Sequence, residues 1–222
     1  MRVKLVGCTQ PTDEFKEEGM GDVQDLISFC ARVSNPSNQM NMETTKKLLN
    51  YLAKHKHWSP FEMASATMEI ETTRDIARQM LRHRSFAFQE FSQRYADPNE
   101  FGDSFVLREA RLQDTKNRQN SIDNVDPRLE GEWRMRQQDV IDKAKEHYNW
   151  AIENGIAKEQ ARAVLPEGNT KSRLYMQGSI RSWVHFIELR SGNGTQKEHI
   201  EVAKACAEAI TKIFPMVNDF VE

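Results

Sequence analysis

One stretch of the sequence constrains the fold more than any other, because a half-buried strand runs directly into a helix there. Apolar and polar side chains alternate over residues 64–71, which is the period of a strand with one buried face. The threonines at 72–73 are suitable N-cap residues, and apolar positions recur with helical spacing over residues 74–82. We expect this helix to bury one face and to deliver Gln79 and Arg82 to its C-terminal end.

The same helix carries arginines at positions 74, 78 and 82, a four-residue spacing that predicts one polar row. Between residues 74 and 94 there are five arginines against two acidic residues, although the whole chain has a net charge of −2 and a pI near 6.3. A basic segment in an acidic protein indicates a discrete anionic ligand. It argues against bulk binding of nucleic acid or of an anionic membrane surface.

The remaining sequence predicts an α/β (α+β) fold with a mixed small sheet and packed helices, and 222 residues suffice for one large domain, residues 1–222. An edge strand is expected at residues 3–6, a short strand at 105–107 and part of another at 174–176, whereas residues 110–128 are polar and irregular. Helices are expected at residues 22–33, 43–54, 128–153, 158–165 and 195–214, and after Ser179, which is a candidate cap.

Nothing in the first thirty residues is typical of a signal peptide, and no apolar run approaches the length that spans a membrane. We therefore expect a cytoplasmic protein with no membrane partner. The three cysteines, Cys8, Cys30 and Cys206, are widely spaced and include no Cys-x-x-Cys pair. This pattern argues against a zinc ribbon and a disulfide framework, so free thiols and no metal site are expected.

Arg82, His83 and Arg84 stand next to one another at the end of the predicted helix. Adjacent residues cannot share one helix face, so the three side chains must point in different directions. Such a splayed cluster suits several anionic groups bound around one loop, because arginine forks match phosphate oxygens. Aromatic and polar residues then alternate over residues 85–95, which is typical of a site that stacks on a flat ring and hydrogen-bonds its edges.

The spacing Arg-His-Arg, seven residues, then Ser resembles the signature of the flavin-dependent thymidylate synthases. Three further motifs of that family have counterparts in the same order. They are His57-Trp58-Ser59-Pro60-Phe61-Glu62, Glu159-Gln160-Ala161-Arg162 with Leu165-Pro166, and Arg181 with Leu189-Arg190. The resemblance covers about residues 57–190. The sequence departs from it at Ser179, where many members carry Asn, at Gly194, where some carry His, and at His185, whose position varies between Asn and His.

The resemblance implies a methyltransferase that makes dTMP from dUMP. It implies FAD as the hydride carrier, 5,10-methylenetetrahydrofolate as the carbon donor and NADPH as the reductant. It also implies α/β protomers that assemble into a homotetramer, with each active site shared between subunits. The expected partners are therefore small molecules, dUMP and folate, and further copies of the same chain, with no nucleic acid.

The resemblance also implies the site residues. Flavin contacts are expected at Ser59, Arg82, His83, Arg84, Glu90, Ser179, Arg181 and His185. Contacts with dUMP are expected at Gln79, Arg82, Glu90, Phe91, Ser92, Gln93, Arg94, Arg162 and Arg190. Arg190 and His57 are the expected catalytic residues, His57 near the flavin and folate.

Two of these roles have a chemical reason. Arg190 is expected to stabilise the anion that forms when uracil C5 becomes nucleophilic, since a guanidinium with a pKa above about 12 is a poor base. Ser92 is expected to hold phosphate rather than to act as a nucleophile, because the sequence places no base beside it.

Three alternatives stay open. A folate-dependent synthase of the unrelated class would attack uracil C6 with a cysteine, but none of the three cysteines has a Pro-Cys-His context or an adjacent base. A catalytically inactive member, or a module that only binds flavin or nucleotide, is opposed by the intact signature and by Arg190. An RNA-binding protein is disfavoured because the chain outside residues 74–94 is acidic.

Overall fold

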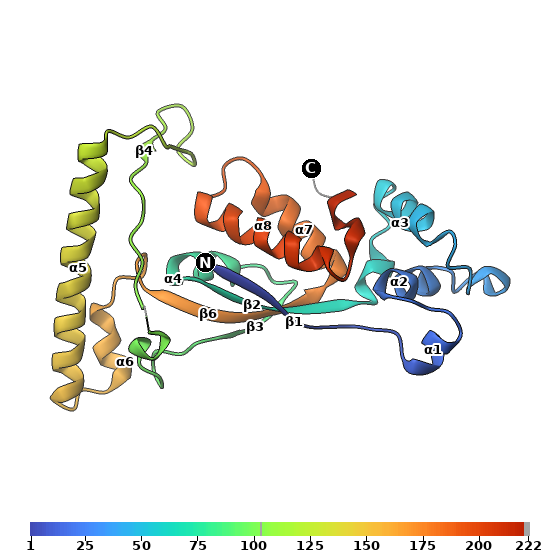
Figure 1. Cartoon of the computed structure of the whole chain (residues 1–222), viewed down its shortest axis with the longest axis horizontal. Coiled ribbons are helices and arrows are strands. Elements are labelled where there is room, and N and C mark those ends of the chain that lie inside the picture. Colours follow the sequence, from blue (N-terminus) through green and yellow to red (C-terminus); the bar gives the residue numbers. More distant parts are fainter. Residues whose placement is uncertain (103, 220–222) are drawn as a thin grey trace.

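The computed structural model describes residues 1–102 and 104–219. In that part of the chain, four strands form one antiparallel sheet in the order β1–β2–β6–β3. The strands are β1 (Arg2–Cys8), β2 (Ser65–Thr73), β3 (Ala87–Glu90) and β6 (Lys171–Ser179). Helices α7 (Ile180–Ser191) and α8 (Lys197–Thr211) lie on one side of the sheet (Figure 1). The predicted α/β class with a small sheet and packed helices is confirmed, and the strand pairings are antiparallel rather than mixed.

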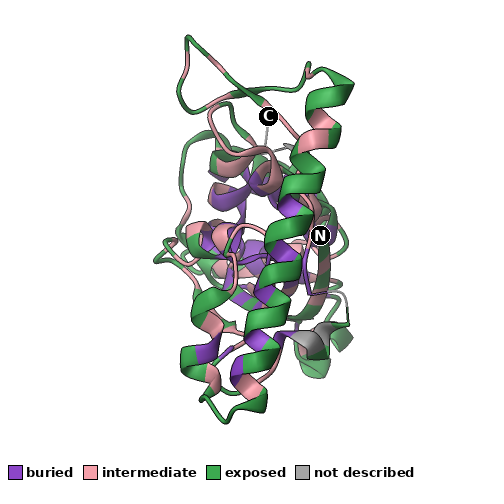
Figure 2. Ribbon diagram, turned by 90° about the vertical axis from the view of Figure 1, so that its left-hand side faces the viewer, coloured by how far each residue is buried: buried purple, intermediate pink, exposed green. Residues whose placement is uncertain are grey.

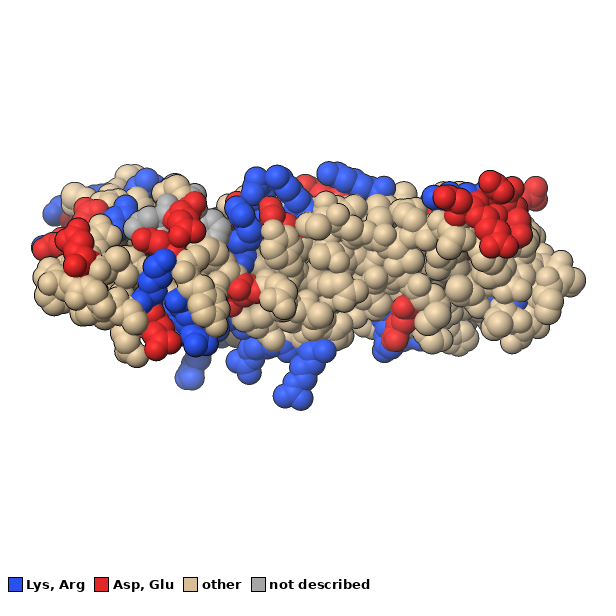
Figure 3. Space-filling view, turned by 90° about the horizontal axis from the view of Figure 1, so that it is seen from below, with Lys and Arg blue, Asp and Glu red and all other residues tan. Residues whose placement is uncertain are grey.

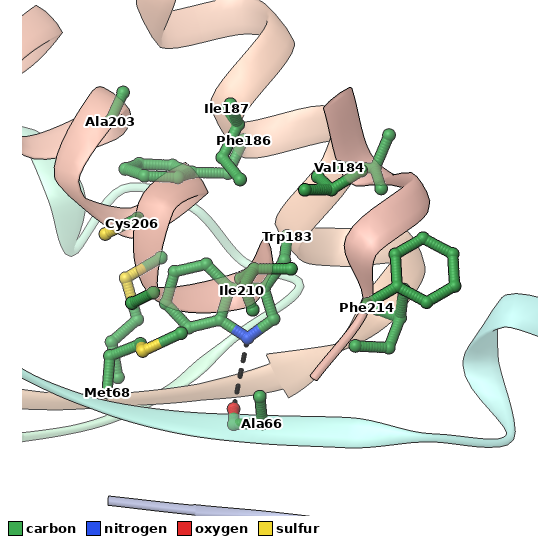
Figure 4. Packing of buried hydrophobic residues seen from close by; sticks show 14 of the residues in the cluster. Ala66, Met68, Trp183, Val184, Phe186, Ile187, Ala203, Cys206, Ile210 and Phe214 are labelled. Carbon is green, nitrogen blue, oxygen red and sulfur yellow. Dashed lines mark hydrogen bonds between the residues drawn. The ribbon is translucent and has the colours of Figure 1, made fainter. Parts of the chain in front are cut away.

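The core lies between the sheet and the helices that cover it. On β2 the side chains of Ala66, Met68 and Ile70 are buried, as the alternation in the sequence predicts. From α7 the indole of Trp183 is fully buried, and its Nε1 donates a hydrogen bond of 3.0 Å to the backbone oxygen of Ala66 (Figure 4). A buried indole N–H needs a partner, so this bond helps to fix how α7 lies on the sheet.

Two strands continue into helices without a loop. β2 leads into α4 (Arg74–Met80), and β6 leads into α7. Because β2 and β6 are antiparallel, with Thr73 opposite Lys171 and Ser65 opposite Ser179, the two helices leave opposite ends of this strand pair. Both helices run back over the sheet, so the C-terminal ends of α4 and α7 approach each other (Figure 1).

The two helices begin with different caps. The Ser179 hydroxyl accepts a hydrogen bond of 3.2 Å from the backbone N–H of Ser182, so it caps α7 as the sequence predicts. Thr73 occupies the N-cap position of α4, but its hydroxyl donates to the carboxylate of Asp75 and caps no backbone group.

The other helices lie towards the two ends of an elongated molecule (Figure 1). At one end are α1 (Asp13–Glu17), α2 (Val23–Ala31) and α3 (Thr45–Lys54), and at the other are α5 (Pro127–Glu153) and α6 (Lys158–Ala161). Most of α5 is exposed, and its buried residues form one stripe (Figure 2). They are Gln137, Ile141, Ala144, Tyr148 and Ala151. The predicted helices are confirmed, with their ends shifted by a few residues.

Short 3₁₀ turns complete the secondary structure. They span Pro36–Asn38, Ser59–Glu62, Pro98–Phe101, Arg162–Val164 and Pro215–Asp219. Within the described ranges, no helix combines the length and the apolar character needed to cross a membrane.

The structure differs from the prediction after α4 and before α5. The sequence pattern does not predict β3, which pairs with the distant strand β6. The strand predicted at residues 105–107 reduces to an isolated bridge between Phe105 and Thr170. Residues 110–128, predicted to be irregular, contain a small hairpin and the start of α5. The hairpin strands are β4 (Leu112–Gln113) and β5 (Ser121–Ile122).

Arg74 contradicts the predicted polar row, because it is only 6% exposed. Its Nη1 lies 3.7 Å from Oε1 of Glu90, and its Nε lies 3.6 Å from Oε1 of Glu167. These carboxylates come from β3 and from the segment before β6, so acidic partners far along the chain make the burial of this charge possible. Arg78 and Arg82 are exposed, as predicted.

Candidate active site

The C-terminal ends of α4 and α7 and the N-terminal end of α8 bring together five polar side chains, which we call the junction cluster. Its members are Gln79, His83, Arg190, Gln196 and His199. A helix C-terminus carries a partial negative charge that favours nearby cations. Arg82, just after α4, and Arg190, in the last turn of α7, meet this preference. Residues predicted from separate motifs therefore converge in the structure.

His83 holds Arg190 in place. The Nε of Arg190 donates a hydrogen bond of 2.9 Å to Nε2 of His83. A guanidinium can only donate, so this Nε2 is unprotonated and the ring proton lies on Nδ1. Burial, together with the charge of Arg190, lowers the pKa of His83 to about 4, so the ring is neutral at neutral pH. Burial and the neighbouring charge of Arg82 lower the pKa of Arg190 in turn.

Gln79 connects α4 to α8. Its Nε2 donates a hydrogen bond of 2.8 Å to Oε1 of Gln196, and its Oε1 lies 3.2 Å from Nδ1 of His199. His199 is fully buried, and this burial, followed by the charges of Arg190 and His83, lowers its pKa to about 4. Both histidines of the junction cluster are therefore neutral at pH 7.

Aromatic side chains form the apolar side of the junction cluster. The ring of Phe186 contacts both histidines, with its centroid 5.0 Å from that of His83 and 5.7 Å from that of His199. Phe86 lies so close to β6 that a Cβ at Gly178 would come within 2.5 Å of its ring. Glycine at position 178 is therefore a packing requirement, because any larger residue would displace Phe86.

A groove brings the His-x-Ser-Pro-Phe-Glu motif beside α7, and we call it the Ser59 groove. It is lined by Leu52, Lys56, His57, Trp58, Ser59, Pro60 and Arg181. His57 and Ser59 are exposed. Arg181 forms an ion pair with Glu62, the last residue of the motif, and so joins the motif to α7. Three residues predicted from two motifs thus line one groove.

His185 lies next to the Ser59 groove on α7. Its ring meets the ring of Trp58 edge-on, with the centroids 4.8 Å apart. Burial lowers the pKa of His185, and the charge of Arg181 lowers it further, while Glu188 acts in the opposite direction. Ser179 stands at the start of the same helix, where its hydroxyl is engaged in the cap.

A third set of predicted residues surrounds Glu159, and we call it the Glu159 group. The Nε of Arg94 lies 3.5 Å from Oε2 of Glu159, and the Nε of Arg162 donates a hydrogen bond of 3.3 Å to the Glu159 backbone oxygen. The Ser92 hydroxyl accepts a hydrogen bond of 3.4 Å from the backbone N–H of Arg94. One acidic residue thus orients two arginines near a serine.

The remaining predicted residues follow β3 and its ends. Glu90 accepts a hydrogen bond of 2.9 Å from the Ser172 hydroxyl, and the backbone N–H of Phe91 donates to the Arg173 backbone oxygen at 2.8 Å. Gln93 is buried, and its Nε2 has no hydrogen-bond partner among the described residues. These contacts hold the chain between the junction cluster and the Glu159 group.

Arg82 and Arg84 are exposed on either side of the half-buried His83. Seen from below, Lys and Arg side chains gather left of the centre and along the edges of the molecule, and the middle of this face is largely uncharged (Figure 3). In the ranges 1–102 and 104–219, no three His, Cys, Asp or Glu side chains lie together as metal ligands would. Most of the predicted residues thus fall into the junction cluster, the Ser59 groove and the Glu159 group, and the rest lie along β3 and its ends.

Comparison with known families covers almost the whole chain. The model of the family described as thymidylate synthase complementing protein matches residues 18–216. The chain belongs to the thymidylate synthase complementing protein family.

Two relatives of this chain are named flavin-dependent thymidylate synthase, as the resemblance in its motifs predicts. A probable flavin-dependent thymidylate synthase of Paramecium bursaria Chlorella virus 1 is 49% identical over 217 residues, which cover 98% of this chain and 97% of the relative. The flavin-dependent thymidylate synthase of Synechocystis sp. is 46% identical over 222 residues, all of both chains. The resemblance to flavin-dependent thymidylate synthases is confirmed.

The fold of this family member also matches a solved structure. The crystal structure of the UMP/dUMP methylase PolB from Streptomyces cacaoi, bound with 5-Br dUMP, superposes with a TM-score of 0.81 at 26% identity. The match covers 99% of this chain and 93% of PolB.

The sequence pattern missed two members of the junction cluster, His199 and Gln196. His199 precedes Val202 by three residues and Cys206 by seven, and both are buried on α8, so helical spacing could have placed it inward. Because histidine is polar, the apolar periodicity that predicts the buried face of this helix does not include it. Gln196 offers no such signal, because it precedes the helix and its contact with Gln79 is tertiary.

Proposed function

We propose that this protein is an FAD-dependent thymidylate synthase, a methyltransferase that converts dUMP to dTMP with 5,10-methylenetetrahydrofolate as carbon donor and NADPH as reductant. The observation that carries the proposal is the Arg190 guanidinium, held by the neutral ring of His83 in a chain of this family. The names of the two relatives support the flavin dependence. PolB, a methylase bound with 5-Br dUMP, supports a uracil nucleotide as substrate.

Arg190 would assist the step that makes uracil C5 nucleophilic. That step places negative charge on the pyrimidine ring, and a cation fixed in advance stabilises the charge without reorganising. A carboxylate in the place of His83 would orient the arginine equally well but would cancel its charge. Neutral His83 orients the guanidinium through Nε and leaves its positive charge for the substrate.

The Ser59 groove has the residue types that a flavin dinucleotide needs. Lys56 and Arg181 offer cations for a pyrophosphate, and Trp58 offers an aromatic surface next to a flat ring. We assign His57, Ser59, Arg181 and the adjacent His185 to this cofactor. Bound there, the flavin supplies hydride transfer, and the chain supplies orientation and shelter from water.

The Glu159 group suits the phosphate of dUMP. Arg94 and Arg162 are donors of the kind that bind phosphate oxygens in pairs, and the Ser92 hydroxyl adds a further donor. Arg94 is half exposed and within reach of Glu159, which keeps the side chain oriented when no phosphate is bound. Substrate binding would exchange part of this ion pair for contacts with the phosphate.

We further propose a homotetramer whose active sites are shared between chains. The junction cluster, the Ser59 groove and the Glu159 group each draw on different elements of one chain. Arg82 and Arg84 are exposed beside the first of these, where a neighbouring chain can bring a phosphate to them. This arrangement would account for a signature whose three adjacent side chains point in different directions.

Purified protein gives a direct test. We expect flavin absorbance bands, present on isolation or after incubation with FAD, and oxidation of NADPH that yields dTMP when dUMP and 5,10-methylenetetrahydrofolate are both supplied. The matched control replaces dUMP with dCMP, which lacks the uracil O4 and should give no methylated product.

Two results would count against the proposal. Absence of flavin bands after incubation with FAD would remove the cofactor assignment. A protein that binds FAD and dUMP but forms no dTMP would instead be a binding module, the alternative that the sequence leaves open.

A further inference from the structure

His199 is the buried titratable group of the junction cluster that the proposed function does not use. It lies in the first turn of α8 and is 0% exposed. A polar side chain is buried at this depth only when a hydrogen bond compensates for the lost water. Nδ1 of His199 lies 3.2 Å from Oε1 of Gln79, whereas Nε2 has no hydrogen-bond partner among the described residues. One hydrogen bond, to Gln79, therefore compensates for the burial of the ring.

The direction of this contact follows from the other end of the Gln79 amide. Nε2 of Gln79 donates a hydrogen bond of 2.8 Å to Oε1 of Gln196. An amide donates only through its nitrogen, so this bond leaves the oxygen of Gln79 to face His199.

Gln79 then presents its own oxygen to the histidine. That oxygen can only accept, so His199 must donate through Nδ1–H. The opposite direction would move the ring proton to Nε2, a buried position without an acceptor, and an unpaired buried donor is unfavourable. The two hydrogen bonds from His199 through Gln79 to Gln196 thus each have one favoured direction.

We propose that His199 is a positioning residue that orients the amide of Gln79 towards the substrate. With its oxygen held by His199 and one N–H held by Gln196, the amide plane of Gln79 is fixed at both ends. Its second N–H is then available to an acceptor oxygen of the pyrimidine nucleotide. The inference rests on the proposed function, because Gln79 meets a nucleotide only if the chain binds dUMP.

Two substitutions distinguish the loss of the Nδ1–H donor of His199 from the loss of the volume of its ring. His199→Leu removes the donor and keeps an apolar side chain beside Phe186, whereas His199→Asn keeps an N–H close to the position of Nδ1. We expect His199→Leu to raise KM for dUMP about 5- to 10-fold and to change kcat less than about threefold. His199→Asn should bring KM back to within about twofold of the wild type. His147→Leu, at an exposed position of α5, is the matched control and should leave both constants unchanged.

A double-mutant cycle tests whether His199 acts through Gln79. In a Gln79→Ala background, His199→Leu should raise KM no further, because the amide that it orients is absent. A folded His199→Leu protein with unchanged KM, or an equal rise in KM with and without Gln79, would overturn the proposal. A kcat loss that His199→Asn does not restore would overturn it as well.

Nitrogen-15 NMR of histidine-labelled wild-type protein tests the bond direction without any variant. We expect the ring proton of His199 on Nδ1, and a proton on Nε2 would contradict the proposed orientation. This measurement needs no turnover. A failure to form dTMP would therefore remove the proposed function, whereas a wrong tautomer would remove only the role of His199.

Discussion

Arg190 differs from Arg94 in having a neutral side chain as its partner. Arg94 lies 3.5 Å from a carboxylate oxygen of Glu159, whereas Arg190 donates to the unprotonated nitrogen of His83. The charge of Arg94 is thus partly balanced before any ligand arrives. The charge of Arg190 is not balanced by its partner, so Arg190 is the better candidate for stabilising a charge that develops during the reaction.

This difference predicts separate kinetic effects for Arg190 and Arg162. Arg190→Ala should lower kcat about 10²–10³-fold, the effect of losing one preorganised donor. Arg190→Lys should restore little, because lysine lacks the planar fork that meets His83. Arg162→Ala should mainly raise KM for dUMP, because a phosphate contact is equally strong in the ground and transition states. Steady-state kinetics at saturating dUMP, with flavin content measured, checks both.

The control for this experiment is reduction of bound flavin by NADPH without dUMP. It should survive in Arg190→Ala, because it requires no activated uracil. The role assignment is wrong if Arg190→Ala changes only KM while Arg162→Ala abolishes turnover at saturating dUMP.

His199 also predicts a pH dependence of stability. Its pKa is about 4 in the folded protein, against an ordinary value of 6.5, so the unfolded chain binds more protons between these values. Its contribution to the free energy of unfolding is therefore complete above pH 6.5 and is lost as the pH falls to 4, by at most about 1.4 kcal/mol per pH unit. His83 has the same lowered pKa but remains in a His199→Leu variant. Urea unfolding at pH 7 and pH 5 should show a smaller loss in that variant than in the wild type, and equal losses would refute the prediction.

Among the elements, α5 is attached to the body of the protein by a buried amide. Oε1 of Gln137 accepts from the backbone N–H of Arg108 at 2.8 Å and from Nδ2 of Asn169 at 3.0 Å. Nε2 of Gln137 donates to the Arg108 backbone oxygen at 2.8 Å. One side chain thus satisfies both backbone groups of a residue outside the helix, in the way that a neighbouring strand would.

Replacing this amide should loosen α5. Gln137→Leu leaves both backbone groups of Arg108 unpaired, and we expect it to lower the free energy of unfolding by about 1–3 kcal/mol. The matched control is Gln138→Leu, since Gln138 is exposed and bonds only locally, to Asp142, and should change stability by less than about 0.5 kcal/mol. Urea unfolding of the two variants side by side checks this. Equal changes in the free energy of unfolding would show that the hydrogen bonds between Gln137 and Arg108 do not hold α5 in place.

The elements that could be predicted from the sequence are those whose burial follows a local pattern. β2 shows a full alternation with Ala66, Met68 and Ile70 buried, so its period is visible in the sequence. β3 has four residues, each half-buried or exposed, and pairs with a strand far along the chain. The sequence pattern places Arg74 in solvent, because the acidic partners that allow its burial are distant in sequence.

The candidate site likewise has features that the sequence predicts and features that depend on distant parts of the chain. The motifs predict the residue types and, through helix α4, the placement of Gln79 beside the signature. They do not predict that His83 is a neutral acceptor for Arg190, because that follows from the meeting of two helix ends. They also omit His199, whose proposed role depends on its burial and on its contact with the distant Gln79.

For the whole molecule, the proposed homotetramer predicts the mass of the particle in solution. It also predicts that two variants with different defects restore activity when they are combined. Light scattering after gel filtration should give close to four times the 25.8 kDa of one chain. If Arg94 and Arg190 enter one active site from different chains, mixed tetramers of Arg94→Ala and Arg190→Ala contain some sites with both arginines intact. Co-expression of the two variants should then yield clearly more activity than either alone. Activity no greater than the average of the two would argue against sharing between these residues.

The pairing of β2 with β6 also determines when the candidate active site can form during synthesis of the protein. The residues that it joins lie about a hundred positions apart, so a long loop must close before α4 and α7 face each other. Local helices form much faster than such closures. A chain still on the ribosome therefore displays Arg82, His83 and Arg84 well before β6 and α7 have been made. The candidate site can therefore form only after β6 and α7 have been made, and shorter nascent chains lack it.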